Sequence, residues 1–388
     1  MATPSDPARA ALWDGAWNRA FELARRGLGR VSPNPPVGAV ILREDRIIGE
    51  GWHRAYGEPH AEREAIADAE ARGESVAGAT MLVTLEPCGH EGRQPPCADL
   101  LVEKGLAEVV YGCDDPSEKT AGKGPERLRA AGIETSMAQG EVPARARALT
   151  RGFRKHCSSG RPLVRLKMAV SLDGRVAGPS GTQVRLTCPE SDALVHAWRS
   201  EFDAIAIGSG TLATDDPRLT ARGVADAAQP TRVVFLGSAG LQPVSGRDAA
   251  VFADLPEAPL VFVLDRKGGG SGSGSGEVEA LERTGATVLE VGPGEPADRF
   301  AEALELLAGA GIRTVLLEGG PVLAATALGS GEVDEMDLFL APVVLSDGPG
   351  AFDPLAPGGI EGGPFDPAGM TVSVSGRDIR LSQVLREW

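Results

Sequence analysis

The chain has 388 residues, of which 42% are hydrophobic and 24% are charged, and its formal net charge at pH 7 is −15. This length predicts more than one domain, and two domains fit it best. The composition is typical of a globular protein without the ~20-residue apolar run of a membrane span, and the negative charge disfavours a nucleic-acid partner relative to a small-molecule substrate.

The start of the chain, Met1–Arg9, is polar and lacks the apolar core of a secretion signal. The five cysteines of the whole chain do not suggest a disulfide framework. We therefore expect a cytoplasmic protein with reduced cysteines.

The first part of the chain alternates helix and strand signals. The expected elements are, in chain order, helix 14–29, strands 37–42 and 46–52, helix 60–72, strand 80–84, helix 97–103, strand 108–111 and helix 124–131. This alternation predicts an α/β domain whose site lies beyond strand ends, at helix N-termini.

Three potential metal ligands and one carboxylate stand at those positions. The motif His60-Ala61-Glu62 begins the helix 60–72, and Cys88 and Cys97 follow the next strand, each after a proline. One imidazole and two thiolates hold zinc with a position open for water, whose pKa then falls to roughly 7. With Glu62 as the proton shuttle, this set predicts a hydrolytic deaminase.

Two other interpretations of these residues stay open at the sequence level. His60, Cys88 and Cys97 can be ordinary buried side chains, or they can hold a structural zinc with His90 as the fourth ligand. Neither interpretation gives Glu62 a role.

A second block of alternating elements follows a boundary at residues 158–162. Its expected elements are strand 163–169, helix 189–200, strands 204–208, 232–236 and 260–264, helix 297–308, strand 314–318 and a helical run at 322–328. This is a doubly wound α/β pattern, and we place the two domains at 1–157 and 162–388. The Gly/Ser run 268–276 predicts a flexible surface loop within the second domain.

The turn Glu318-Gly319-Gly320-Pro321 follows a strand and precedes a helix, so its backbone amides can hold a dinucleotide phosphate. The same pattern also occurs in ordinary turns. Arginines flank a second segment, residues 212–214, and can bind a substrate phosphate, although exposed arginines are commonly only solvated. They are Arg199, Arg218 and Arg222, with Asp215 and Asp216 between them.

These motifs together resemble the bifunctional riboflavin-biosynthesis deaminase/reductase family over nearly the whole chain. In the first half, the similar segments are 27–40 (GLGRVSPNPPVGAV), 57–62 (GEPHAE) and 85–97 (LEPCGHEGRQPPC); in the second half, they are 166–175 (LKMAVSLDGR), 210–220 (GTLATDDPRLT) and 317–321 (LEGGP). The eight-residue gap between the cysteines is a trait of this family.

The resemblance implies a cytidine-deaminase-like three-layer α/β/α domain followed by a dihydrofolate-reductase-like α/β domain. The first would use Zn²⁺ to deaminate a diaminopyrimidinone that carries ribosylamine 5′-phosphate, and the second would use NADPH to reduce the ribosyl group to a ribityl chain. A homo-oligomer is also expected.

The resemblance also assigns site residues. It implies zinc contacts for His60, Cys88 and Cys97, proton transfer by Glu62, and pyrimidine contacts for Asn34 and His53. In the second half, the expected cofactor residues are Ala169, Arg185, Thr211, Asp215, Ser238 and Gly320, and the expected substrate residues are Lys167, Gln183, Arg199, Leu219, Arg222 and Glu318. Lys167, Asp215 and Glu318 are all candidates for the proton donor of the reduction.

The second half departs from the family at one segment. The chain reads Gln183-Val184-Arg185-Leu186-Thr187 where the family has Ser-x-Trp-Ile-Thr, and Gly237 replaces an aspartate. Arg185 can compensate by binding a phosphate, because a guanidinium offers a bidentate fork. Three interpretations therefore stay open: a bifunctional enzyme, a deaminase with a second domain that only binds nucleotide or acts as a scaffold, and a non-enzymatic zinc protein.

Overall fold

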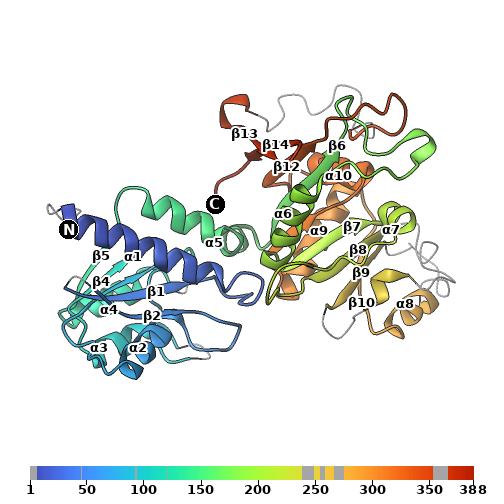
Figure 1. The fold of residues 1–388 in the computed structure, drawn as a ribbon. Coiled ribbons are helices and arrows are strands. Elements are labelled where there is room, and N and C mark those ends of the chain that lie inside the picture. The colour runs from blue at the N-terminus through green and yellow to red at the C-terminus, as the bar shows by residue number, and fades with distance from the viewer. Residues whose placement is uncertain are drawn as a thin grey trace. The chain divides into compact units, whose positions relative to one another are not determined.

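The computed structural model describes residues 7–44, 46–91, 94–118, 120–237, 249–253, 258–265, 275–352 and 366–388. The chain divides into two compact units, Met1–Gly160 with Trp388, and Arg161–Glu387. Each unit is built on one β-sheet with helices against it (Figure 1). Among the described residues, no helix has both the length and the apolar character that crossing a membrane requires.

The sheet of the first unit has the strand order β2-β1-β3-β4-β5. Its strands are β1 Gly38–Arg43, β2 Arg46–Trp52, β3 Thr80–Val83, β4 Glu108–Tyr111 and β5 Glu134–Met137. Strand β1 is antiparallel to both of its neighbours, whereas β3, β4 and β5 are parallel to one another. The carboxyl ends of β3 and β4 therefore lie at one edge of the sheet, where the site forms.

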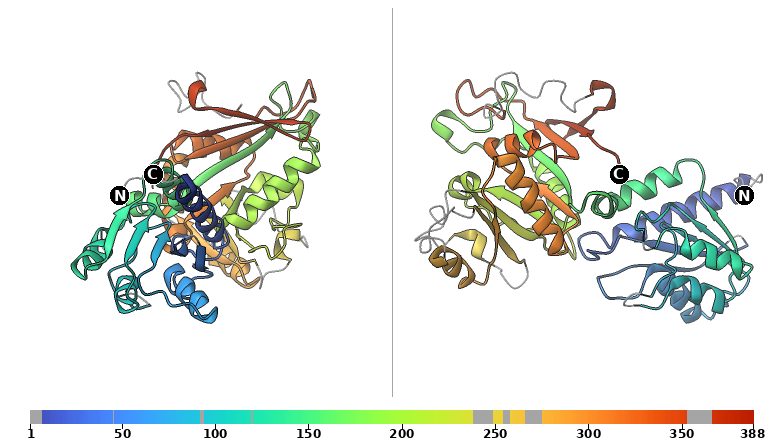
Figure 2. Two further views of the ribbon diagram at one scale, coloured as in Figure 1. Left: turned by 60° about the vertical axis from the view of Figure 1, so that its left-hand side comes forward. Right: turned by 180° about the vertical axis from the view of Figure 1, so that it is seen from behind.

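Helices cover both faces of this sheet, which makes three layers (Figures 1 and 2). The helices are α1 Pro7–Arg25, α2 Ala61–Ala71, α3 Cys97–Glu103, α4 Lys123–Ala130 and α5 Val142–Ser159. Because side chains alternate along a strand, Ala39 and Ile41 of β1 pack with α2, α3 and α4, while Val40 and Leu42 pack with α1 and α5. The α/β/α layering predicted from the sequence is confirmed.

Gly38 shows how closely α1 lies against the sheet. A Cβ atom on Gly38 would lie 2.1 Å from the carbonyl oxygen of Ala20 in α1, so a side chain at this position would push the helix away. The helix buries Ala16, Ala20 and Leu23 on this face, at helical spacing.

The sheet of the second unit has the order β10-β9-β8-β7-β11-β6-β12-β14-β13 among the described residues. Its strands are β6 Leu163–Val170, β7 Ala204–Gly208, β8 Thr231–Gly237, β9 Leu260–Asp265, β10 Thr287–Val291, β11 Thr314–Leu317, β12 Glu335–Leu340, β13 Thr371–Ser375 and β14 Asp378–Val384. The strands from β10 to β12 are parallel, and β14 and β13 continue the sheet in antiparallel pairing. Seven parallel strands thus end at the same edge of the sheet.

The helices of the second unit also lie on both faces of its sheet (Figures 1 and 2). They are α6 Pro189–Glu201, α7 Ser209–Asp215, α8 Ser275–Glu282, α9 Pro296–Gly309 and α10 Pro321–Gly329, with single 3₁₀ turns at Pro179–Gly181, Ala250–Phe252 and Pro367–Gly369. One apolar core joins α9 and α10 to the sheet, and a second core on the opposite face includes α7 and α8.

Two features of the second unit differ from the sequence-based expectations. The last two residues of the Gly/Ser run 268–276, Ser275 and Gly276, begin helix α8, and the rest of the run lies outside the described residues. Strand β10 and the strands β12, β13 and β14 were not expected, because no chemical motif marks them; β12, in addition, pairs with β6, which is distant in sequence.

Candidate active sites

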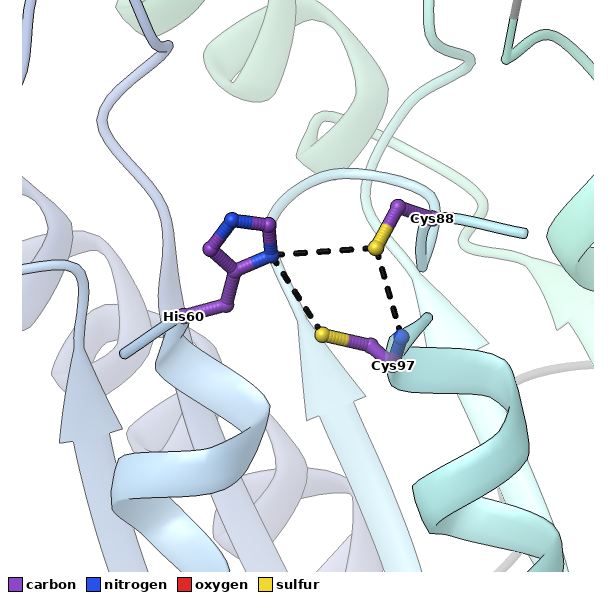
Figure 3. Close-up of side chains that lie close together, drawn as sticks. All are labelled: His60, Cys88 and Cys97. Atoms are coloured by element: carbon purple, nitrogen blue, oxygen red, sulfur yellow. Dashed lines mark hydrogen bonds between the residues drawn. The ribbon is translucent and has the colours of Figure 1, made fainter. Parts of the chain in front are cut away.

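Three side chains from separate elements of the first unit converge beyond strand β3. Nδ1 of His60 lies 3.7 Å from Sγ of Cys88 and 3.4 Å from Sγ of Cys97. Figure 3 shows the three side chains pointing toward one another. His60 immediately precedes α2, Cys97 begins α3, and Cys88 lies in the loop between β3 and α3. The backbone N–H of Cys97 donates a hydrogen bond to Sγ of Cys88 at 3.3 Å.

These three residues fit a zinc ion. Zinc–sulfur and zinc–nitrogen bonds of ~2.3 and ~2.0 Å at a tetrahedral angle place nitrogen and sulfur ~3.5 Å apart, close to the two distances in this cluster. Within the described residues, the metal-binding cluster contains only His60, Cys88 and Cys97. His90 is exposed and is not part of the cluster, so a closed structural site with His90 as the fourth ligand is not formed.

The electrostatics of the pair of thiols suit a cation. Hydrogen bonding with Cys97 and His60 lowers the pKa of the Cys88 thiol well below its ordinary value, and hydrogen bonding with Cys88 together with burial raises the pKa of Cys97. One proton is thus shared within the pair. A divalent cation would displace that proton, because thiolates and not thiols are metal ligands.

Glu62 is almost fully buried, with 4% of its surface exposed, and it lies in the first turn of α2 beside the metal cluster. Burial and the charge of Cys88 raise the pKa of its carboxyl group. A carboxyl group whose pKa is raised holds a proton more readily than an ordinary one, which suits a group that both accepts and delivers protons.

A cavity of about 300 Å³ opens beside this cluster. His60, Glu62 and Cys88 line it together with Asn34 and His53, so it contains both residues expected to contact a pyrimidine. Nδ1 of His53 donates to the carbonyl of Pro59 at 3.1 Å, so its Nε2 accepts from the Asn34 amide at 3.1 Å. Burial lowers the pKa of His53, and the imidazole is therefore neutral.

The cavity also contains polar residues that the sequence did not single out. They are Glu86, Gln94, Asp115, Ser117 and Thr120; His90, considered above as a fourth zinc ligand, lines the cavity as well. The Glu86 carboxylate accepts hydrogen bonds from the backbone N–H groups of Gly122 at 2.5 Å and Asp115 at 3.4 Å, and it thereby ties the loop after β4 to the end of β3. The position of Asp115 just after a parallel strand is the sequence feature that could have identified it as a site residue.

A larger cleft of about 840 Å³ lies at the carboxyl ends of the parallel strands in the second unit. Most of the expected reductase residues line it. Those that do are Lys167, Ala169, Gln183, Arg199, Thr211, Asp215, Leu219, Glu318 and Gly320.

Three expected reductase residues are not placed in that cleft. The Arg185 side chain is 73% exposed and does not line the cleft. Its guanidinium pairs instead with the carboxylate of Asp192, at 2.5 Å. Arg222 is exposed and also outside the lining, with its guanidinium on the Thr220 hydroxyl at 3.0 Å. Ser238 lies outside the described residues.

A buried ion pair marks one end of the cleft. The Arg199 guanidinium donates to both carboxylate oxygens of Glu318, at 2.7 and 2.9 Å. Burial pushes the pKa of Glu318 upward, but Arg199 and Lys167 outweigh it and lower that pKa. Burial lowers the pKa of the Lys167 ammonium, while the negative charge of Glu318 opposes this shift.

The middle of the cleft has the features of a phosphate cradle. The N-terminus of α10 follows Gly319 and Gly320, and the N–H of Gly320 donates to the Thr211 hydroxyl at 3.1 Å. A Cβ atom on Gly210 would meet nothing within 4 Å, so the backbone here is open to a ligand. These residues fit the phosphates of a dinucleotide.

Two family models match the chain. The cytidine and deoxycytidylate deaminase zinc-binding region matches residues 15–113, and the RibD C-terminal domain matches residues 162–358. The riboflavin biosynthesis protein RibD of Aquifex aeolicus is 35% identical over 329 residues, which cover 85% of this chain and 86% of that protein. The chain belongs to the RibD family.

Other members of the RibD family agree with this assignment. The RibD protein of Escherichia coli is 36% identical over 84% of this chain and 87% of its own length. The crystal structure of a diaminohydroxyphosphoribosylaminopyrimidine deaminase/5-amino-6-(5-phosphoribosylamino)uracil reductase from Thermotoga maritima superposes with a TM-score of 0.81 at 31% identity. That superposition covers 96% of this chain and 99% of that one.

Membership of the RibD family establishes the activities at a general level. The protein is a bifunctional enzyme of riboflavin biosynthesis, with a zinc-dependent deaminase and an NADPH-dependent reductase of dihydrofolate-reductase-like fold. The bifunctional interpretation is thus favoured over a deaminase with an inactive second domain.

Proposed function

We propose that the first unit deaminates 2,5-diamino-6-ribosylamino-4(3H)-pyrimidinone 5′-phosphate and that the second unit reduces the ribosyl group of the product to a ribityl chain. We assign the two activities to residues 1–157 and 162–388. The convergence of His60, Cys88 and Cys97 beside the buried Glu62, at the edge of a cavity, is the observation that supports the deaminase most strongly.

In the deaminase unit, zinc when bound supplies a Lewis acid that makes water nucleophilic at neutral pH. Glu62 takes one proton from the attacking water and delivers it to the ring nitrogen. It then carries the remaining hydroxyl proton to the amine, which leaves as ammonia while the carbonyl forms. Asn34 and His53 hold the pyrimidine; the neutral His53 accepts a hydrogen bond at Nε2, and its bond to Pro59 fixes the ring.

In the reductase unit, NADPH when bound supplies the hydride. Thr211, Gly320 and the α10 N-terminus hold its phosphates, and Ala169 and Asp215 line the same cleft. Arg199, Leu219 and Gln183, which line this cleft as well, contact the phosphorylated substrate. A binding role for Arg185, Arg222 or Ser238 stays a prediction.

Of the three candidate proton donors, we favour Lys167. Glu318 is held ionised by Arg199 and has no proton to give, and Asp215 accepts a hydrogen bond from the Gln183 amide at 3.2 Å. Burial lowers the pKa of Lys167, which makes its ammonium a stronger acid than that of an ordinary lysine. Glu318 then keeps this ammonium positioned through charge.

One assay tests both activities. The zinc-loaded protein is incubated with the diaminopyrimidinone substrate, with and without NADPH, while ammonia release and NADPH absorbance are followed separately. We expect ammonia in both reactions and NADPH oxidation in the second. Ammonia without oxidation would support a deaminase with an altered second domain, and no signal in either channel would overturn the substrate assignment.

A cytoplasmic location and a homo-oligomer complete the proposal, on the strength of the resemblance alone. Light scattering of the purified full-length protein measures its oligomeric state, and a monomer at micromolar concentration would contradict the homo-oligomer.

A further inference from the structure

The cleft of the second unit extends well beyond the groups that handle the reaction. Across the sheet edge, the parallel strands run β10, β9, β8, β7, β11 and β6. Lys167 lies on β6 and Glu318 follows β11, so the proposed chemistry occupies one end of this row. Four strand spacings of ~4.8 Å separate β6 from β9, or ~19 Å in total. An elongated ligand can therefore lie along the edge.

An arginine and an aspartate line the far end of this cleft. Asp265 is the last residue of β9, and Arg299 lies in the first turn of α9. Nη1 of Arg299 forms a salt bridge with Oδ2 of Asp265, and their side chains are 27% and 18% exposed. Nε of Arg299 is buried and has no hydrogen-bond partner among the described residues. The guanidinium thus keeps donor capacity that Asp265 alone does not satisfy.

The direction in which NADPH must lie in the cleft indicates which part of the cofactor reaches Asp265 and Arg299. The hydride-donating ring has to face the substrate groups at Lys167 and Glu318, and the phosphates fit the cradle at Thr211 and Gly320. The adenosine half then extends over β8 and β9. Gly237, at the end of β8, adds no side chain there.

NADPH and NADH differ only at the adenosine ribose, which carries a 2′-phosphate in NADPH and a 2′-hydroxyl in NADH. A guanidinium matches a phosphate, whereas a carboxylate matches a hydroxyl and repels a phosphate. The cleft offers one group of each kind, and the two are held together.

We propose that Arg299 and Asp265 form the subsite for the adenosine ribose, in which Arg299 binds the 2′-phosphate and Asp265 positions the guanidinium. This inference rests on the proposed cofactor cleft of the second unit. The pair sets the preference for NADPH over NADH, because only the phosphate gives Arg299 a second anionic acceptor. Asp265 weakens phosphate binding by its charge while it orients the arginine.

The test uses two probes that differ by the phosphate alone. Isothermal titration of the full-length, zinc-loaded protein measures the affinity for adenosine 2′,5′-bisphosphate and for adenosine 5′-monophosphate. The unmodified protein should bind the bisphosphate more tightly. Arg299→Gln should lower the affinity for the bisphosphate ~10- to 100-fold, as expected for loss of a hydrogen-bonded charge. The affinity for the monophosphate should change less than ~3-fold. Arg299→Lys should recover part of this loss.

Two further variants separate this subsite from a general effect on folding. Asp265→Asn removes the competing charge and should raise the bisphosphate-to-monophosphate affinity ratio several-fold. Arg283→Gln, at an exposed arginine just after α8 and outside the cleft lining, should change neither affinity.

An unchanged affinity ratio in Arg299→Gln, or an equal loss of both probes in Arg299→Gln and Arg299→Lys, would overturn the inference. Binding of NADPH by the unmodified protein, followed by cofactor fluorescence, distinguishes two kinds of failure. If NADPH binds but the 2′-phosphate confers no preference, only this subsite is wrong. If NADPH does not bind, the cofactor cleft itself is wrong as well.

Discussion

Glu62 illustrates how burial gives one side chain a chemical role. Its carboxylate is enclosed in the first turn of α2, two residues after His60, so the chain carries it to the metal cluster. Desolvation favours its neutral form, while the nearby imidazole favours the ionised form. The side chain is therefore able to change protonation state during a reaction without contact with bulk water.

The first prediction concerns Glu62→Gln. The amide keeps the size of the side chain but cannot carry the proton, so the rate of ammonia release should fall by ~10²- to 10⁴-fold. Zinc content, measured by atomic absorption, and reduction of the already deaminated substrate should be unchanged. A variant that deaminates like the parent would show that Glu62 is not the proton shuttle.

Lys167 is the proposed proton donor of the second unit, and its environment differs from that of Glu62. It lies on β6 with its ammonium 5.6 Å from the centre of the Phe339 ring, and the Arg199–Glu318 ion pair acts on it electrostatically. The ion pair itself is enclosed, with 14% and 11% of its side chains exposed. Removing one partner would leave the other charge buried and unpaired.

The second prediction is a pH profile for the reductase. If the Lys167 ammonium donates the proton, the rate is highest below its pKa and falls as the pH rises through it. Because burial lowers that pKa, the fall should begin below the ~10.4 of an ordinary lysine. Lys167→Arg should remove this alkaline limb from kcat, since arginine stays protonated, whereas a purely structural lysine would leave the limb in place.

At the scale of elements, helix α4 supports the loop that carries Cys88. A Cβ atom on Gly124, in the first turn of α4, would lie 1.7 Å from the carbonyl oxygen of Pro87. The carbonyl of Cys88 also accepts a hydrogen bond from the N–H of Ala98 in α3, at 3.1 Å. Two helices therefore fix the position of one zinc ligand through the backbone.

The third prediction is that Gly124→Ala impairs the metal site from outside it. The helix or the Cys88 loop must move, so stability should fall by ~1–3 kcal/mol and zinc affinity should decrease. Chemical denaturation and competition with a chromophoric chelator measure these effects. Gly15→Ala is the control, because Gly15 lies in α1 with nothing within 4 Å of its added Cβ. This exchange should raise stability by ~0.5–1 kcal/mol and leave zinc affinity unchanged. Equal zinc affinity in both variants would contradict the support role of α4.

At the scale of the whole molecule, each unit has its own apolar cores and its own ligand site. The metal cluster and its cavity belong to the first unit, and the cofactor cleft belongs to the second. A ligand that binds only one folded unit stabilises that unit by mass action.

The fourth prediction follows from this separation. Removal of zinc by a chelator should increase hydrogen–deuterium exchange in peptides from α2 and α3 and leave those from α9 and α10 unchanged. Saturation with NADPH at ~100 times its dissociation constant should slow exchange in the peptides from α9 and α10. The free energy of the opening that permits exchange there should rise by up to ~2.7 kcal/mol. Exchange that changes equally in both units with either ligand would indicate that they do not respond separately.

The sequence by itself determined the ligand types, the α/β fold class and the family. His60, Cys88, Cys97 and Glu62 are recognisable because metal and proton chemistry demand particular side chains at short spacing, and strand and helix signals are local. Strands β5, β10, β12, β13 and β14 and helix α5 carry no such motif, and they were missed. The sheet order also depends on pairings between distant segments, such as β11 between β7 and β6.

Only the tertiary structure decided which charged side chains share a site. The sequence placed Arg185 with the cofactor, yet its guanidinium pairs with Asp192 outside the cleft. The sequence provided no reason to connect Asp265 with Arg299, which lie close together because the end of β9 faces the first turn of α9. The physical reason is that the partner of an arginine depends on which acceptors the fold brings within reach: the start of α6 offers Asp192 to Arg185, and the strand order that places β9 beside β10 offers Asp265 to Arg299.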